Sequence, residues 1–137
     1  MRVAACAILI LAALAGACSA PASVDDTERE VAKFHHQLNA GDYASIWQTT
    51  GDDMRAATTE SDMTKVFSAV NRKLGKVVET KQVGWRSNVT TSGSFTGVQM
   101  QTKFEKGEGL EDFAYRKIGD RLVLAGYHIN SKDMMVN

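Results

Sequence analysis

The chain has 137 residues, with 16 Lys and Arg against 16 Asp and Glu, so its formal net charge at pH 7 is zero. A chain of this length can form one ordinary domain with a core but hardly two. The balanced charge gives no overall field that would favour nucleic acid or an anionic membrane surface. Nucleic acid is therefore not expected among the partners.

The first predicted element is an export signal. A single cation, Arg2, precedes an uncharged and mostly apolar stretch over residues 3–14, and the small residues Ala-Gly-Ala follow at 15–17. The stretch is shorter than the run of about 20 apolar residues that a transmembrane helix needs, and small residues are typical of a signal-peptidase cleavage point. Because Cys18 comes next, the segment resembles a bacterial lipoprotein signal that ends at residue 17.

This resemblance implies that Cys18 becomes the first residue of the mature chain and carries lipid. Several acyl chains anchor a protein stably, since each buried methylene contributes about 0.8 kcal/mol. Ser19 stands where an inner-membrane retention signal would place aspartate, so the resemblance implies the outer membrane, with the domain facing the periplasm. Residues 18–24 are then the lipidated cysteine and a short linker. Cys6 is removed with the signal, so the mature domain has no thiol for a disulfide, a metal or nucleophilic attack.

Three amphipathic helices are predicted at the start of a single domain over residues 25–131. Asp25 or Asp26 caps the first helix, Asp42 caps the second, which residues 53–57 can extend, and Thr59 caps the third. Gly41 and Gly75 are natural stops for the first and third helices. The side chains at helical spacing are Val31, Phe34, His35 and Leu38, then Tyr43, Ile46, Trp47 and Thr50, then Met63, Val66, Phe67, Val70 and Leu74.

After the third helix the apolar period changes from about 3.6 to 2, which is typical of strands. The predicted strands are 76–86, 95–106, 110–118 and 121–129, with hairpin connections at 107–109 and 119–120, a polar loop at 87–94 and a frayed tail over 132–137. Expected to share a face are Val98, Met100, Thr102 and Phe104, and likewise Val123, Ala125, Tyr127 and Ile129. Helices followed by strands predict an α+β fold with a four-stranded antiparallel sheet.

The order of these elements, with Gly41-Asp42-Tyr43 before Trp47, Leu74-Gly75 after the third helix and Gly126-Tyr127 near the end, resembles the domain of unknown function 4019 family of bacterial lipoproteins. That family is thought to belong to the nuclear transport factor 2-like, or cystatin-like, superfamily, and a sister family, domain of unknown function 3887, fits almost as well. The resemblance spans Val31 to Ser131. It implies a cone in which a curved sheet wraps around the first helices and leaves an apolar pocket at its open end.

Four side chains are candidates for lining that pocket, namely His35, Trp47, Trp85 and Tyr127. His35 lies on the apolar stripe of the first helix, where it could be a pocket base or a histidine at the edge of the core. His36 points about 100° away from it, so the two cannot bind one metal ion in the i, i+4 manner. No metal site and no cofactor are expected. Most aromatic side chains should fill the core, with Trp85 and Tyr127 nearer the pocket mouth.

The function stays open between three classes, because superfamily members include isomerases and dehydratases as well as proteins that only bind, and fold alone does not decide between them. We expect a non-catalytic envelope lipoprotein that binds a small apolar ligand or a segment of an envelope protein in the concave face of the sheet. The first alternative is an isomerase or hydrolase-like enzyme that uses His35 or an inward acid, Glu111 or Asp112, whose side chains point to opposite faces. The second is a structural homodimer formed through the exposed face of the sheet.

Overall fold

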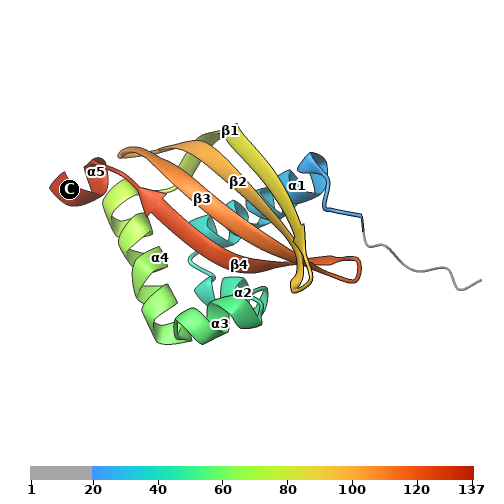
Figure 1. The fold of residues 1–137 in the computed structure, drawn as a ribbon. Helices are drawn as coiled ribbons and strands as arrows, with labels where there is room; N and C mark the ends of the chain where they lie inside the picture. Colours follow the sequence, from blue (N-terminus) through green and yellow to red (C-terminus); the bar gives the residue numbers. More distant parts are fainter. Residues whose placement is uncertain (1–19) are drawn as a thin grey trace, which may run out of the picture.

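The computed structural model describes residues 20–137, which form helices followed by a four-stranded antiparallel sheet. The elements are α1 (Val24–Ala40), α2 (Tyr43–Gln48), α3 (Asp52–Ala57), α4 (Glu60–Leu74), β1 (Val77–Thr90), β2 (Gly93–Phe104), β3 (Gly107–Ile118), β4 (Arg121–Asn130) and α5 (Asp133–Val136). Figure 1 shows α1 crossing one face of the curved sheet, with α2, α3 and α4 beside its β4 edge. The predicted α+β class is confirmed.

The chain enters the domain directly before α1. Ala22 is buried, and the Lys117 ammonium donates a hydrogen bond to the Ala20 carbonyl at 2.7 Å, so this short segment is already held against the β3–β4 hairpin. The predicted signal at 1–17 and Cys18 lie outside the described residues. Among the helices that are described, none has the length and apolar character needed to cross a bilayer.

The N-cap of α1 is Ser23 and not Asp25 or Asp26 as predicted. Its hydroxyl accepts a hydrogen bond from the Asp26 N–H at 3.1 Å, and the Asp26 carboxylate accepts one from the Ser23 N–H at 3.4 Å. This reciprocal pair is a capping box, which satisfies two N–H groups at the start of the helix instead of one. Gly41 ends α1 at φ 71°, a left-handed conformation that suits glycine, as predicted.

The segment between α1 and α4 forms two separate short helices, so the predicted extension of the second helix through residues 53–57 is wrong. The Gly51 N–H donates to the Leu124 carbonyl at 2.9 Å, and the Leu124 N–H donates to the Thr49 carbonyl at 3.0 Å. The backbone at 49–51 therefore pairs with β4 instead of continuing the helix. Glycine is needed here because a Cβ at position 51 would lie 2.7 Å from Val123 Cγ2.

The buried face of α4 is narrower than predicted. Met63, Phe67, Val70 and Leu74 are buried, whereas Val66 is 46 % exposed. At about 100° per residue, position 66 lies about 70° from the centre of the stripe that the other four define. Thr59 caps the helix as predicted, since its hydroxyl oxygen accepts from the Asp62 N–H at 3.2 Å.

The sheet has the order β1-β2-β3-β4, and its first hairpin is longer than predicted. Pairing between β1 and β2 continues to Thr90 opposite Gly93, so the expected loop at 87–94 is wrong. The polar side chains at 87, 88 and 90 are exposed while their backbone continues the ladder, so a polar composition did not mark a loop there. The β2–β3 turn lies at 105–106, between Phe104 and its partner Gly107, and not at 107–109; the turn at 119–120 is confirmed.

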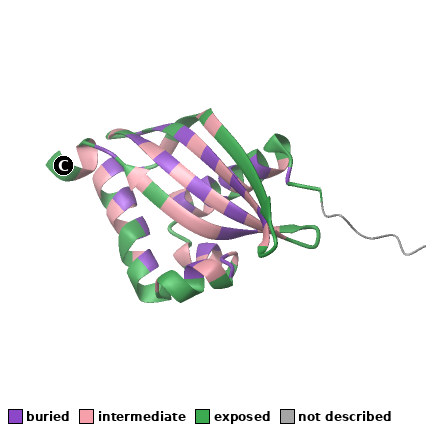
Figure 2. Ribbon diagram, viewed as in Figure 1, coloured by how far each residue is buried: buried purple, intermediate pink, exposed green. Residues whose placement is uncertain are grey.

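Side chains from one face of the sheet pack against α1, α2 and α4 to form the core. Val98, Met100, Thr102 and Phe104 are all buried on one face of β2, as predicted, and Figure 2 shows the alternation of buried positions along the strands. On β4 the predicted face is right for Tyr127 and Ile129 but wrong for Val123 and Ala125, because the register shifts at Ala125, which has no partner on β3. Leu124 pairs with Tyr115 and Tyr127 pairs with Phe113, so Leu124 replaces Val123 on the core face.

The C-terminal residues form a helix that is tied to the domain, and not the predicted frayed tail. The Lys73 ammonium donates hydrogen bonds to the carbonyls of Met134 at 2.6 Å and Asn137 at 3.1 Å. The Asn137 amide in turn donates to the carbonyls of Lys73 and Lys106. These contacts join α5 to the end of α4. The Lys73 cation of α4 lies at the C-terminal carbonyls of α5, where a positive charge is favourable.

Candidate functional site

A buried carboxylate, Glu111, joins three elements inside the domain. Glu111 is 0 % exposed on the core face of β3. Its Oε1 lies 2.7 Å from His35 Nε2 on α1, and the Tyr127 hydroxyl on β4 donates to its Oε2 at 2.8 Å. Asp112 points to the opposite face, where it accepts from the Gln99 amide at 2.9 Å. The prediction that one of these two acids faces inward is confirmed, and the inward one is Glu111.

Aromatic rings surround this cluster of Glu111, His35 and Tyr127. The Phe34 ring lies 4.9 Å from that of Tyr127 and 5.8 Å from that of His35, and the Phe113 ring lies 5.2 Å and 5.8 Å from the same two. Burial and the neighbouring Glu111 charge raise the pKa of Tyr127 well above its usual value of 10.0. Because an isolated buried carboxylate is costly, the two partners are what allow Glu111 to lie here.

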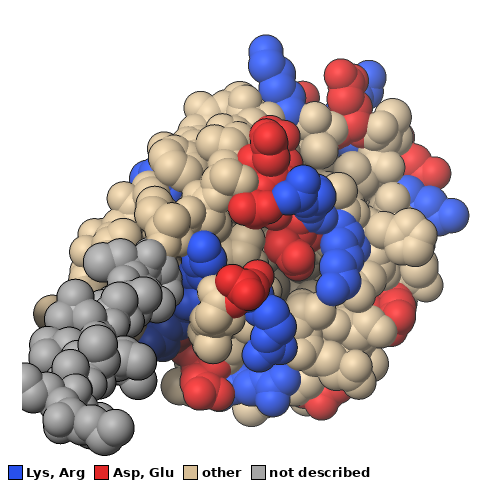
Figure 3. Space-filling model, turned by 90° about the vertical axis from the view of Figure 1, so that its right-hand side faces the viewer, with Lys and Arg blue, Asp and Glu red and all other residues tan. Residues whose placement is uncertain are grey.

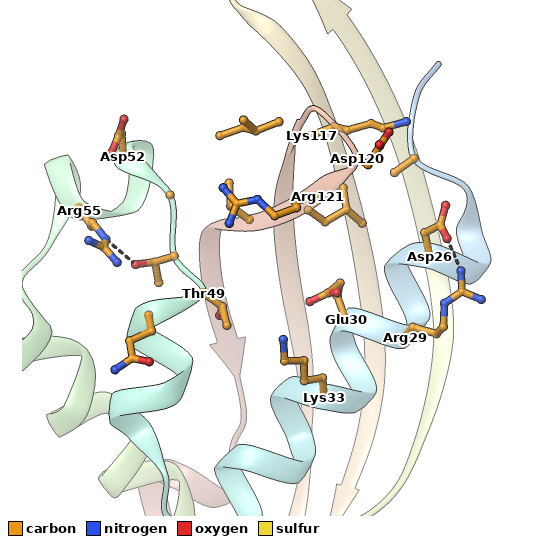
Figure 4. A pocket seen from close by; sticks show the side chains of 17 residues that line it. Asp26, Arg29, Glu30, Lys33, Thr49, Asp52, Arg55, Lys117, Asp120 and Arg121 are labelled. Carbon is orange, nitrogen blue, oxygen red and sulfur yellow. Dashed lines mark hydrogen bonds and ion pairs between the residues drawn. The ribbon is translucent and has the colours of Figure 1, made fainter. Parts of the chain in front are cut away.

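A charged cleft of about 790 Å³ lies on a different part of the surface. It lies between α1, the α2–α3 segment and the β3–β4 hairpin, as Figure 4 shows. Its basic lining residues are Arg29, Lys33, Arg55, Lys117 and Arg121, and its acidic ones are Asp26, Glu30, Asp52 and Asp120. Figure 3 shows acidic and basic side chains intermingled around a hollow on one end of the molecule. His35, Glu111 and Tyr127 are not among the residues that line this cleft.

Three of the cleft cations are held in place by neighbouring groups, one of them Lys117 through its hydrogen bond to the Ala20 carbonyl. Arg55 donates to the Thr50 hydroxyl at 3.1 Å and to the Trp47 carbonyl at 3.2 Å, and its guanidinium lies 5.3 Å from the centre of the Trp47 ring. Arg29 pairs with Asp26, whose pKa is lowered by hydrogen bonds from Ser23 and by the Arg29 charge. Lys33 and Arg121 make no ion pair with any residue that the structure describes, and Figure 4 shows both directed into the cleft.

A small chamber of about 10 Å³ shares Glu30, Lys33 and Thr49 with the cleft. Tyr115 lines this chamber and is 3 % exposed, and its hydroxyl has no hydrogen-bond partner within residues 20–137. Burial raises the pKa of Tyr115 well above its usual value, and the charges of Glu30 and Glu111 raise it further. The volume is about that of one water-sized group.

A second groove, of about 490 Å³, lies between α1 and the β1 side of the sheet. Its apolar surface comes from Val31 and Ala32 of α1 and from Met100 of β2. Thr80 and Gln82 of β1 complete the wall. The interior between α1 and the sheet is occupied by core side chains. Both cavities therefore lie at the margins of the core.

The four predicted pocket residues do not meet in one pocket. His35 and Tyr127 come together on Glu111, Trp47 supports the cleft wall beneath Arg55, and Trp85 lies apart on β1, 40 % exposed and opposite Val98. The cleft residues Glu30, Lys33 and Arg121 and the chamber residue Tyr115 were missed. Their only sequence signal was the spacing of Asp26, Glu30 and Lys33 on one face of α1, which is also typical of an ordinary solvated face. No cluster of metal-binding side chains occurs in the described part of the chain.

A comparison with protein-family models matches residues 31–119 to the family described as Protein of unknown function (DUF3887). The match runs from α1 to the β3–β4 turn and so includes Glu111, Tyr115 and the cleft residues Lys33, Arg55 and Lys117. The cleft residues Glu30 and Arg121 lie outside the matched range. This is the second of the two families that the sequence analysis named. No curated protein matches the chain.

Proposed function

The chain belongs to the DUF3887 family, and we propose that it is a lipid-anchored module of the bacterial cell envelope that binds a small charged ligand in the cleft without catalysing a reaction. Cys18 is the lipidated residue, and the domain faces the periplasm, with the outer membrane as the expected site. The nuclear transport factor 2-like relationship and the likeness to the 4019 family remain part of this proposal. The observation that carries it is the cleft of about 790 Å³ lined by five basic and four acidic side chains.

The size and chemistry of the cleft favour a small polar ligand over the apolar one expected from sequence. Its volume is in the range of small-molecule sites. Lys33 and Arg121 have no ionic partner among the described residues, and the same holds for Glu30. Anionic groups on a ligand could pair with Lys33 and Arg121, and a cationic group could pair with Glu30.

The position of Glu111 supports binding rather than catalysis. A general base must reach the proton that it abstracts. Both carboxylate oxygens of Glu111 are already engaged, by His35 and Tyr127, and the residue is fully buried. The cluster is therefore better placed to hold α1 on the sheet than to act on a ligand in the cleft.

The proposed lipid anchor at Cys18 is tested by labelling cells that express the protein with radioactive palmitate. The label should enter the wild type and the Cys6→Ala variant but not Cys18→Ala. Cys6 is the matched control because it is the other cysteine of the chain. Label that remains in Cys18→Ala would contradict the proposed anchor.

The binding function is tested by native mass spectrometry of the protein purified from its host after removal of the covalent lipid anchor at Cys18. A retained small molecule should be present in the wild type and in Lys81→Glu, an exposed cation on β1, and absent in Arg121→Glu. The same spectrum reports the oligomeric state, so a dimer without ligand would favour the structural alternative. Retention that does not depend on Arg121 would contradict binding in the cleft.

A further inference from the structure

The buried hydroxyl of Tyr115 has no hydrogen-bond partner within residues 20–137, and it lines a small chamber that shares Glu30, Lys33 and Thr49 with the cleft. Its chamber has room for about one water-sized group. A buried polar group without a partner is costly, so a ligand atom that fills the chamber and bonds to this hydroxyl would gain stability. Glu30 and Lys33 both line the chamber, and the Glu30 carboxylate is an acceptor for a donor group on a ligand.

Three basic side chains, Lys33, Arg55 and Arg121, line the cleft beside the chamber, together with the acidic Asp52 and Asp120. Lys33 and Arg121 point into this space, and Arg55 is fixed beside it with guanidinium N–H groups to spare. Neither Lys33 nor Arg121 forms an ion pair with a described residue. Guanidinium groups match the geometry of phosphate oxygens well. A ligand that fits both parts carries a small ammonium group and, next to it, a phosphate.

The chain enters the domain at the same end of the molecule. Ala22 lines the cleft, and Lys117, another lining residue, holds the Ala20 carbonyl at 2.7 Å. Position 18 is two residues before Ala20, a span of at most about 7 Å along the chain. If Cys18 carries the acyl chains, as proposed above, the mouth of the cleft lies close to the lipid headgroups.

We infer that the ligand of the cleft is the headgroup of a zwitterionic phospholipid of the ethanolamine type. The ammonium enters the chamber and donates to the Glu30 carboxylate and the Tyr115 hydroxyl oxygen, while the phosphate accepts from Lys33, Arg121 and Arg55. The glycerol and acyl chains then extend toward the mouth. The inference names the ligand of the proposed binding function and rests on it.

The test is a ¹H–¹⁵N NMR titration of the chain from position 18 onward, with Cys18→Ser, which contains every described element. The probes are short-chain phosphatidylethanolamine, phosphatidylcholine and phosphatidylglycerol, each below its micelle concentration, and free O-phosphoethanolamine. The ethanolamine lipid should bind most tightly, with shifts at the amides of Lys33, Thr49 and Leu122. The choline lipid should bind at least about tenfold more weakly, because its methylated nitrogen has no N–H to donate and is larger than the chamber.

Two tyrosine variants separate binding from folding. Tyr115→Phe should weaken binding of the ethanolamine lipid by about tenfold without loss of protein stability. Tyr127→Phe should reduce protein stability and leave the affinity for the lipid unchanged. Arg121→Gln should weaken binding and Lys81→Gln should not.

Equal binding of choline and ethanolamine lipids, or an unchanged affinity in Tyr115→Phe, would overturn the inference. Binding of free O-phosphoethanolamine without binding of the lipid would overturn the lipid as the ligand. A retained molecule of different chemistry, dependent on Arg121, would overturn the inference while leaving the proposed binding function in place.

Discussion

Glu111 Oε1 on β3 lies 2.7 Å from His35 Nε2 on α1, although the two residues are 76 positions apart in the chain. The contact fixes the first helix on the core face of the sheet. The second carboxylate oxygen of Glu111 accepts a hydrogen bond from Tyr127, so the carboxylate also bridges β3 and β4. The buried polar cluster thus specifies how three elements meet.

Replacing Glu111 by Leu should strongly destabilise the domain. The imidazole of His35 and the hydroxyl of Tyr127 would lose their partner, and unpaired buried polar groups cost about 1–3 kcal/mol each. Urea unfolding should therefore show a loss of about 2–4 kcal/mol relative to wild type. Asp112→Asn is the matched control on the opposite face of the same strand and should change stability by less than about 0.5 kcal/mol. A Glu111→Leu protein as stable as wild type would refute a structural role for the cluster.

Removing the two buried tyrosine hydroxyls should have opposite consequences. Tyr127→Phe leaves Glu111 Oε2 without its donor and should cost about 1–3 kcal/mol. Tyr115→Phe removes a hydroxyl that has no partner among the described residues and should be neutral or slightly stabilising. Thermal unfolding of the two variants beside the wild type measures the difference. The assignment of partners fails if Tyr115→Phe is the more damaging change.

Stability should decline in alkaline solution because of the same two residues. Their pKa values are raised in the folded protein, so above pH 10 the folded state retains phenolic protons that the unfolded state releases. The free energy of unfolding therefore falls as pH rises through the unfolded value, by up to about 1.4 kcal/mol per pH unit for each tyrosine. Urea unfolding between about pH 9 and pH 11 should show a shallower decline in Tyr115→Phe than in wild type. Equal slopes would contradict the raised pKa of Tyr115.

Gly51→Ala should disturb the contact between the α2–α3 segment and β4. The new methyl group would lie 2.7 Å from Val123 Cγ2, and overpacking of this kind costs about 1–3 kcal/mol. Shortening the neighbour makes room, so Gly51→Ala combined with Val123→Ala should lose less than the sum of the two single changes. Thermal unfolding of the double-mutant cycle measures this coupling. Strictly additive losses would indicate that the methyl group meets no obstacle at Val123.

Local patterns accounted for most of the elements and their order. The helical spacing of Phe34, His35 and Leu38 and the capping groups Asp42 and Thr59 predicted the helices correctly, because these signals act within one turn of a helix. Errors arose where a distant segment decided the local structure. Leu124 pairs with the backbone at 49–51 and ends α2, and Lys73 binds the C-terminal residues that composition alone marked as frayed.

The sequence by itself determined the fold class, the order of helices and strands and the inward or outward alternation along β2 and β3, since each follows from the period of the apolar side chains. It also placed Glu111 and Asp112 on opposite faces. Only the tertiary structure decided that His35 and Tyr127 both bond to Glu111. It also decided that Lys33 and Arg121 border one cleft and that Tyr115, whose hydroxyl has no partner among the described residues, lines a small chamber beside it. Such groupings depend on the packing of α1 against the paired strands. The sequence does not indicate which charged side chains on separate elements will become neighbours in the fold.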